Sequence, residues 1–286
     1  MIAVTGATGA VGGRVAAQLA ERGAAQRLVV RDPARAPRID GADVVGGASY
    51  GDGEAMRRAF DGADTVFLVS AHEDRDRVSL HRSAVDAAVA AGVERIVYTS
   101  FFAAAADATF TFGRDHFHTE EHIKGTPLRW TFLRDNIYLD FMPVFAGEDG
   151  VIRGPAGDGR AAVVARDDVA AVAAVALTED GHAGQTYGMT GPESLTLYDA
   201  AEQVAQAAGR PVSYVPETLE EARASRAPSG AADWEIEGWV TSYAAIAAGE
   251  LEPVSGDVER LTGRRPISLA EFLRGNPDSY RHLRPA

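Results

Sequence analysis

The stretch VTGATGAVGGRV, residues 4–15, decides the fold, because it joins a short apolar strand to a helix through closely spaced glycines. Gly6, Gly9 and Gly12 follow the spacing G-x-x-G-x-x-G directly after the run IAVT at residues 2–5. Glycine permits the tight turn, and the free N–H groups and positive dipole end of the following helix can hold a pyrophosphate. A plain strand-to-helix turn is the alternative, but the strand–turn–helix context favours a dinucleotide site. We expect the cofactor contacts of this turn to come from Gly6, Thr8, Gly9, Ala10, Val11 and Gly12.

The first half of the chain alternates β-rich runs with helical patterns, as a parallel α/β sheet requires. Further strands are predicted at residues 27–31, 42–46, 64–70, 95–100 and 128–134. This rhythm predicts a doubly wound parallel sheet with ligands beyond the carboxyl ends of its strands. It changes near residue 134, so we expect a dinucleotide-binding domain over residues 1–134, with a segment near 160–190 returning to it. Residues 135–286 are expected to form a smaller α/β lobe that covers the substrate.

Composition excludes several classes of protein. The net charge of −13 disfavours nucleic acid and anionic membranes as partners. The absence of cysteine rules out disulfides, thiolate nucleophiles and iron–sulfur ligation. The N-terminus has no signal-peptide pattern, and no apolar run reaches about 18 residues, so we expect a soluble cytoplasmic protein.

The end of the second strand distinguishes between two cofactors. An acidic residue there would bind the adenosine ribose of NAD, whereas an arginine would pair with the 2′-phosphate of NADP. The sequence VVRDP places Arg31 before Asp32. The guanidinium of Arg31 suits a phosphate, and Asp32 precedes a proline and is better suited to a turn or cap. NADPH is therefore the predicted cofactor, with NADH less favoured.

Polar residues also lie at the ends of the later predicted strands, where the rest of a dinucleotide would bind. Ser49 and Tyr50 are candidates for the adenine end. Ser70, Thr99 and Ser100 are candidates for the nicotinamide ribose. Each of these residues has the alternative of bonding its own backbone.

Several segments together resemble the NmrA-like, atypical short-chain dehydrogenase/reductase family. They are VTGATGAVG, VVRDP, HRSAVDAAVAAGVERIVYTS, HFHTEEHI, WTFLRDNIY and GPAGDGRAAVVARDDVA. Within the family, the chain is most similar to flavin-independent NADPH:quinone oxidoreductases and triphenylmethane-dye reductases. The resemblance implies a Rossmann domain with a small substrate lobe, NADPH without flavin or metal, and hydride transfer to a quinone-like or aromatic acceptor. The family also contains regulators that only bind the dinucleotide. A homodimer is left open.

The usual catalytic pair of short-chain dehydrogenases, Tyr-x-x-x-Lys, is absent. The only lysine is Lys124, and position 120 holds Glu120 in place of tyrosine. The candidates for catalysis are therefore His116 as a proton donor or a group that holds the nicotinamide, Asn136 as a hydrogen-bond partner, and Tyr138 as a stacking or donating group.

Two further polar motifs could serve function or could serve structure alone. Arg77 and His81, one helical turn apart, are expected to anchor the cofactor loops. His118, Glu121 and His122 spell H-x-x-E-H, a zinc-peptidase pattern. Its position before a strand of a Rossmann pattern argues against zinc, and we expect no metal. Three functions remain: an NADPH-dependent reductase, a dinucleotide sensor without turnover and a zinc hydrolase, of which the zinc hydrolase has much the weakest support.

Overall fold

The computed structural model describes residues 1–284, which form two compact units. Each is described by itself. The first unit comprises Met1–Ala104, Asp115–Arg134 and Arg166–Tyr187, and the second comprises Ala105–Arg114, Asp135–Ala165 and Gly188–Ala286.

The first unit is built on a seven-stranded sheet with the order β3-β2-β1-β4-β5-β6-β9. The strands are β1 (Ile2–Thr5), β2 (Gln26–Val29), β3 (Asp43–Val45), β4 (Thr65–Leu68), β5 (Arg95–Phe101), β6 (Arg129–Asp135) and β9 (Gln185–Met189). β1 pairs in parallel with both β2 and β4, β2 with β3, and β4 with β5. The strand order reverses direction between β1 and β4, and such a switch point opens a crevice at the carboxyl ends of the strands. The predicted doubly wound α/β fold is confirmed.

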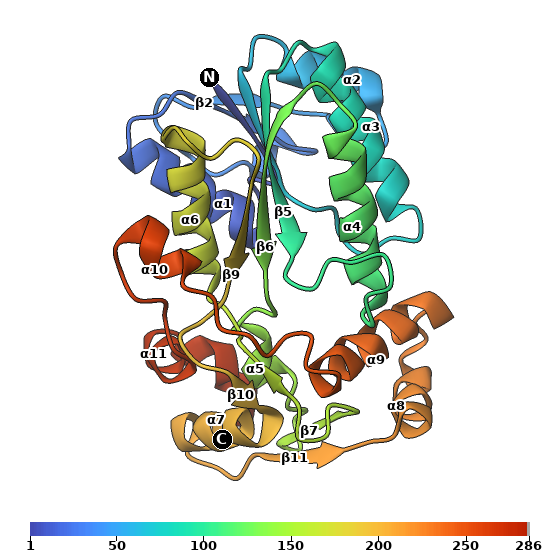
Figure 1. Cartoon of the computed structure of the whole chain (residues 1–286). Coiled ribbons are helices and arrows are strands. Elements are labelled where there is room, and N and C mark those ends of the chain that lie inside the picture. Colours follow the sequence, from blue (N-terminus) through green and yellow to red (C-terminus); the bar gives the residue numbers. More distant parts are fainter. Residues whose placement is uncertain (285–286) are drawn as a thin grey trace. The chain divides into compact units, whose positions relative to one another are not determined.

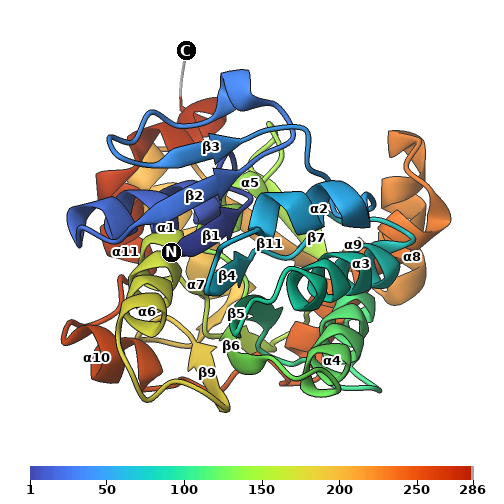
Figure 2. The same cartoon turned by 90° about the horizontal axis from the view of Figure 1, so that it is seen from above.

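Helices cover both faces of this sheet, as Figures 1 and 2 show. α1 (Ala10–Glu21) packs against α6 (Arg166–Thr178) on one face. On the other face lie α2 (Gly53–Phe60), α3 (Arg77–Ala90) and the part of α4 (Thr111–Lys124) that belongs to this unit. The core beneath them is apolar and includes the fully buried side chains of Phe60, Tyr98, Ile123 and Phe132. A short 3₁₀ turn, η1 (Pro33–Arg35), follows β2.

The second unit contains short strands and most of the remaining helices. β7 (Val151–Gly154) pairs in parallel with β11 (Ser213–Pro216), and β8 (Arg160–Ala161) pairs antiparallel with β10 (Leu195–Thr196). The helices are α5 (Phe141–Val144), α7 (Leu197–Ala208), α8 (Leu219–Arg226), α9 (Asp233–Ala247), α10 (Asp257–Thr262) and α11 (Leu269–Gly275), with 3₁₀ turns at Ala227–Ser229 and Pro277–Leu283. Capping boxes start α7, α8 and α11, so these helix starts are specified locally.

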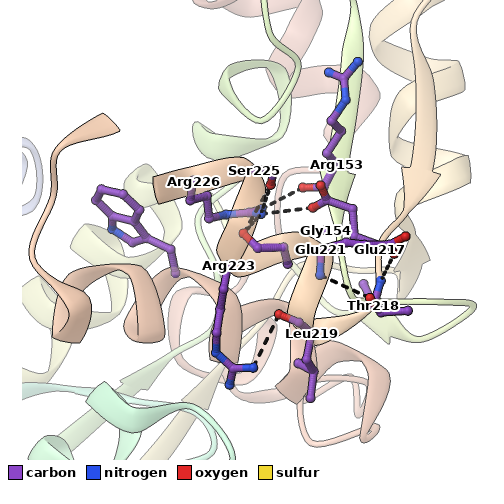
Figure 3. Close-up of polar contacts among 12 residues, drawn as sticks. Arg153, Gly154, Glu217, Thr218, Leu219, Glu221, Arg223, Ser225 and Arg226 are labelled. Carbon is purple, nitrogen blue, oxygen red and sulfur yellow. Dashed lines mark hydrogen bonds and ion pairs between the residues drawn. The ribbon is translucent and has the colours of Figure 1, made fainter. Parts of the chain in front are cut away.

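A largely buried ion pair in the second unit ties α8 to Glu217, the residue that follows β11 (Figure 3). The Arg226 guanidinium lies 3.0 Å from a carboxylate oxygen of Glu217, and the two side chains are 16% and 10% exposed. The same guanidinium donates to the carbonyl oxygen of Arg153 and lies over the ring of Tyr243. Burying these two charges is tolerable because both are paired and hydrogen-bonded.

Candidate cofactor and active site

The glycine-rich turn of the first unit needs glycine for two measurable reasons. Gly6 has φ +62°, a conformation that side chains disfavour. A Cβ atom on Gly12 would lie 2.3 Å from the carbonyl oxygen of Gly6 and 2.8 Å from that of Thr5. The turn is closed by a 2.8 Å hydrogen bond from the Gly9 N–H to the Gly6 carbonyl. No side chain caps the start of α1, so its first N–H groups are available to an anion.

A cavity of about 740 Å³ opens beside this turn, within the size range of ligand sites. Gly6, Thr8 and Gly9 line one part of it. The rest is lined mainly by residues that follow the carboxyl ends of β2, β3 and β4, namely Val29–Arg31, Ala48–Gly51 and Val69–Asp74. Ser49, Tyr50 and Ser70, three of the predicted cofactor contacts, lie among them. A groove along the carboxyl ends of successive strands, with the turn of Gly6, Gly9 and Gly12 (the glycine cradle) at one end, fits an extended dinucleotide.

Three residues of the turn that we expected to touch the cofactor are absent from the lining of this cavity. Ala10 is exposed and borders a neighbouring hollow that Thr8 and Gly9 also line. Val11 and Gly12 are buried against the sheet. Their side of the helix packs inward, so only their backbone N–H groups can serve an anion.

Two charged residues follow β2, and only the cationic one, Arg31, lines the cavity. The exposed side chain of Arg31 lines the cavity and forms no ion pair with any of residues 1–284. Asp32 accepts a 3.0 Å hydrogen bond from the N–H of Ala34 and caps the 3₁₀ turn, as predicted. The arrangement fits a phosphate at Arg31 better than a ribose hydroxyl at Asp32.

The Tyr50 hydroxyl is used inside the protein. It lies 2.6 Å from the Thr5 hydroxyl oxygen and donates to the Val69 carbonyl at 2.6 Å. Burial raises the pKa of Tyr50, so the phenol stays protonated and joins the ends of β1 and β4. The ring remains at the cavity wall, where its face can pack against a flat ligand.

Thr99 and Ser100 differ from their predicted roles. Both are buried. The Thr99 hydroxyl accepts a 2.7 Å hydrogen bond from the N–H of Ser70, and the Ser100 hydroxyl donates to Glu120 at 2.6 Å. Neither residue lines the cavity of the first unit. The Thr99 hydroxyl joins the end of β5 to the segment after β4, and the Ser100 hydroxyl joins β5 to α4. Direct contact of either hydroxyl with a cofactor ribose is therefore disfavoured.

His116 is buried, 6% exposed, with both ring nitrogens engaged. Arg77 can only donate, so its 3.2 Å contact makes Nε2 the acceptor, and Nδ1–H must donate to the Tyr98 hydroxyl at 2.9 Å. Burial and the nearby Arg77 hold the pKa of His116 well below its usual range. A neutral imidazole with no spare hydrogen is a poor general acid, so the predicted proton transfer by His116 is disfavoured.

Arg77 and His81 anchor the loop after β4, as the sequence predicted. Arg77 Nε donates to the Ala71 carbonyl at 3.0 Å, and His81 Nε2 accepts from the Ala71 N–H at 2.8 Å. The N–H and the carbonyl of Ala71, in the cavity wall, are therefore both bound by side chains of α3. Burial lowers the pKa of His81 to about 3, which keeps this imidazole neutral.

An ion pair between α4 and the end of β6 was not predicted. Arg134 binds the Glu120 carboxylate through Nε at 2.9 Å and Nη2 at 2.6 Å. The Glu120 side chain is 1% exposed and that of Arg134 is 26% exposed. A signal was available, because a glutamate on the inward face of a predicted helix requires a partner. Tyr98 was missed for the same reason, since a tyrosine within a buried strand needs one as well.

Asn136 and Tyr138 belong to the second unit. The buried Asn136 amide donates to the Leu251 carbonyl at 2.9 Å and accepts from the Ile137 N–H at 2.8 Å, so one of its two amide hydrogens is used within residues 1–284. The Tyr138 hydroxyl donates to the Asp135 carboxylate. Its ring is part of an aromatic group with Phe141, so its face, more than its hydroxyl, suits an aromatic ligand.

The H-x-x-E-H residues point to separate partners. His118 is exposed, Glu121 pairs with Lys124 at 2.7 Å, and His122 contacts Asp86 at 2.8 Å. Within residues 1–284, no three histidine, aspartate or glutamate side chains converge in a way that could hold a metal. None of the helices in that range combines the length and apolar character that crossing a bilayer requires.

Comparison with known proteins places the chain in a family. A model of an NAD(P)H-binding family matches residues 6–180. A (4-alkanoyl-5-oxo-2,5-dihydrofuran-3-yl)methyl phosphate reductase of Streptomyces griseus is 36% identical, covering 98% of this chain and 99% of its own.

Two solved structures support the same placement. The NADPH-dependent quinone oxidoreductase of Escherichia coli, complexed with NADPH, has a TM-score of 0.88 at 32% identity and covers 96% of this chain and 99% of its own. The Citrobacter sp. triphenylmethane reductase complexed with NADP(H) has a TM-score of 0.84 at 30% identity, with the same coverage. The chain therefore belongs to the NAD(P)H-binding, NmrA-like family of oxidoreductases.

Proposed function

We propose that this protein uses NADPH to reduce a quinone-like or other conjugated small molecule, without flavin or metal. The observation that carries the proposal is the cavity of the first unit, which combines the glycine-rich turn with the Arg31 guanidinium, for which residues 1–284 offer no ion-pair partner. In this proposal the first unit binds the dinucleotide, with residues 1–134 and the segment near 160–190. Residues 135–286 supply the lobe that covers the acceptor.

The residues of the turn would hold the pyrophosphate, and Arg31 would hold the 2′-phosphate. When bound, NADPH supplies a hydride, which together with one proton reduces the acceptor by two electrons. An electron-poor conjugated ring accepts hydride without a strong acid, so the lack of a Tyr-x-x-x-Lys pair does not prevent this reaction. Water can deliver the proton.

The protein's contribution is then mainly orientation. The Tyr138 ring would stack on the acceptor, and the remaining Asn136 amide hydrogen would donate to it. His116 is neutral and fully bonded, so we give it no proton-transfer step. The acceptors in the relatives' names, a quinone, a triphenylmethane dye and a dihydrofuranone phosphate, support a conjugated acceptor.

A panel of acceptors tests the proposal. The purified protein is mixed with NADPH and, separately, benzoquinones, naphthoquinones, azo dyes and triphenylmethane dyes, and NADPH absorbance is followed. We expect oxidation with at least one class, and no flavin fluorescence in the supernatant of denatured protein. Tight NADPH binding with no oxidation by any acceptor would instead support a dinucleotide sensor.

Calorimetric titration tests the cofactor preference separately. Because Arg31 faces the cavity and Asp32 is occupied in a cap, NADPH should bind more tightly than NADH. Tighter binding of NADH would refute the role given to Arg31.

A further inference from the structure

Three polar residues on one side of α4 are completely or almost completely buried. His116, Thr119 and Glu120 are 6%, 0% and 0% exposed. Polar groups removed from water destabilise a protein unless they are hydrogen-bonded. The partners of these three residues lead to three successive strand ends of the sheet.

The first two residues act through α3. His116 Nε2 accepts from Arg77, and the Thr119 hydroxyl lies 2.8 Å from His81 Nδ1. Thr119 donates its own hydrogen to the Asp115 carbonyl, so it accepts from His81. Arg77 and His81 then bind the carbonyl and the N–H of Ala71. Ala71 lies in the loop after β4, within the wall of the proposed cofactor cavity.

The third residue acts directly on the next two strands. One oxygen of Glu120 accepts from the Ser100 hydroxyl at the end of β5 and from Arg134 Nε. The other oxygen accepts from Arg134 Nη2, near the end of β6. Ser100 and Arg134 lie on strands that are neighbours in the sheet. The carboxylate therefore joins their carboxyl ends.

We propose that His116, Thr119 and Glu120, the α4 ladder, are positioning residues that hold the carboxyl ends of β4, β5 and β6 in the geometry required for hydride transfer. This inference rests on the proposed reductase function. None of the three is assigned contact with cofactor or acceptor.

Stability alone is a weak reason for such a network. A buried ion pair or polar chain can often be replaced by apolar side chains with no loss of stability. What a fully bonded network adds is a unique arrangement of the groups it joins. Hydride transfer depends on that arrangement, since a displacement of about 1 Å can lower a rate by about a hundredfold.

The variant Thr119→Val tests the ladder, because valine has nearly the same shape but cannot accept from His81. Hydrogen exchange of the ligand-free protein, followed by mass spectrometry, should show exchange about tenfold faster in the peptide that contains Ala71. The Kd for NADPH should change less than about threefold, because the glycine turn and Arg31 are untouched. The single-turnover rate of NADPH oxidation by an accepted quinone should fall about 10- to 100-fold.

Two variants serve as controls. Thr119→Ser keeps the hydroxyl and should restore both exchange and rate to near wild-type values. His118→Ala changes an exposed side chain of the same helix and should leave all three measurements unchanged. If Thr119→Val does not fold, Arg77→Lys replaces it, because lysine lacks the fork that joins the Ala71 carbonyl to His116.

Two results would overturn the proposal. Unchanged exchange at Ala71 would show that the ladder does not hold the loop. Faster exchange with an unchanged hydride-transfer rate would show that the ladder holds the loop without serving the reaction. If the wild-type protein oxidises no NADPH, the proposed function has failed, and the exchange experiment still reports on the ladder by itself.

Discussion

Lowering the pH should destabilise this protein through His81, and replacing that residue should remove part of the effect. Burial lowers the pKa of His81 to about 3, with a further contribution from Arg77. The unfolded chain, with a histidine pKa near 6.5, binds the proton more readily than the folded protein. The stabilisation from keeping His81 neutral is therefore complete above about pH 6.5 and is lost as the pH falls towards the folded pKa.

The size of the effect follows from the two pKa values. Between pH 7.5 and 5.5 the unfolded histidine becomes mostly protonated while the folded one stays neutral. Proton linkage then reduces the free energy of unfolding by about 1.4 kcal/mol over this interval. The result is insensitive to the folded pKa, provided that it lies well below 5.5.

Urea unfolding of the wild-type protein and of His81→Gln, at pH 7.5 and at pH 5.5, measures this quantity. Glutamine can still accept from the Ala71 N–H but does not titrate. The variant should be less stable at pH 7.5, because the bond to Thr119 is lost. Its free energy of unfolding should fall by about 1.4 kcal/mol less than that of the wild type on going to pH 5.5. Other titrating groups cancel in this difference, so equal losses in both proteins would refute the assignment of a neutral buried His81.

Three further outcomes are expected. Gly12→Ala places a Cβ 2.3 Å from the Gly6 carbonyl oxygen. Calorimetry should therefore show NADPH binding at least about tenfold weaker, and urea unfolding should show a free energy of unfolding lower by about 1–3 kcal/mol. Wild-type values in both assays would contradict the role given to the glycine-rich turn. Arg31→Ala should weaken the binding of NADPH about tenfold or more and the binding of NADH less than about twofold. Equal losses of affinity for the two cofactors would refute the contact between Arg31 and the 2′-phosphate. Glu217→Gln leaves the Arg226 charge unpaired and should lower the free energy of unfolding by about 2 kcal/mol, whereas Asp278→Asn, at an exposed pair, should have almost no effect.

Much of the first unit could be predicted because its signals are local. The turn from Gly6 to Gly12 is specified by a backbone conformation and a close approach that only glycine allows. The six predicted strands follow from apolar runs, and the cap at Asp32 follows from a short side chain that bonds an N–H group two residues ahead. These features need no knowledge of distant residues.

The candidate site was predictable only in part, because strand ends were inferred correctly but side-chain directions were not. Ser70 lines the cavity, whereas Thr99 and Ser100, which lie in the last residues of β5, bond to Ser70 and Glu120. The Ser100 hydroxyl could bind a cofactor or a neighbouring side chain, and the position of α4 decides that it binds Glu120. No periodic pattern in the sequence predicts that position. The same holds for His116, whose burial between α3 and β5 removed the proton-transfer role that its residue type suggested.

The sequence by itself therefore determined the sheet, the glycine-rich turn and the cap at Asp32, since each depends on residues close together along the chain. Only the tertiary structure decided which groups the side chains of HFHTEEH contact. His116, Thr119 and Glu120 are 14 to 49 positions away in sequence from Ala71, Ser100 and Arg134, and hydrogen bonds across such separations form only once α3 and α4 have packed on the sheet. That packing turns a segment that resembles a metal site into a set of supports for three strand ends.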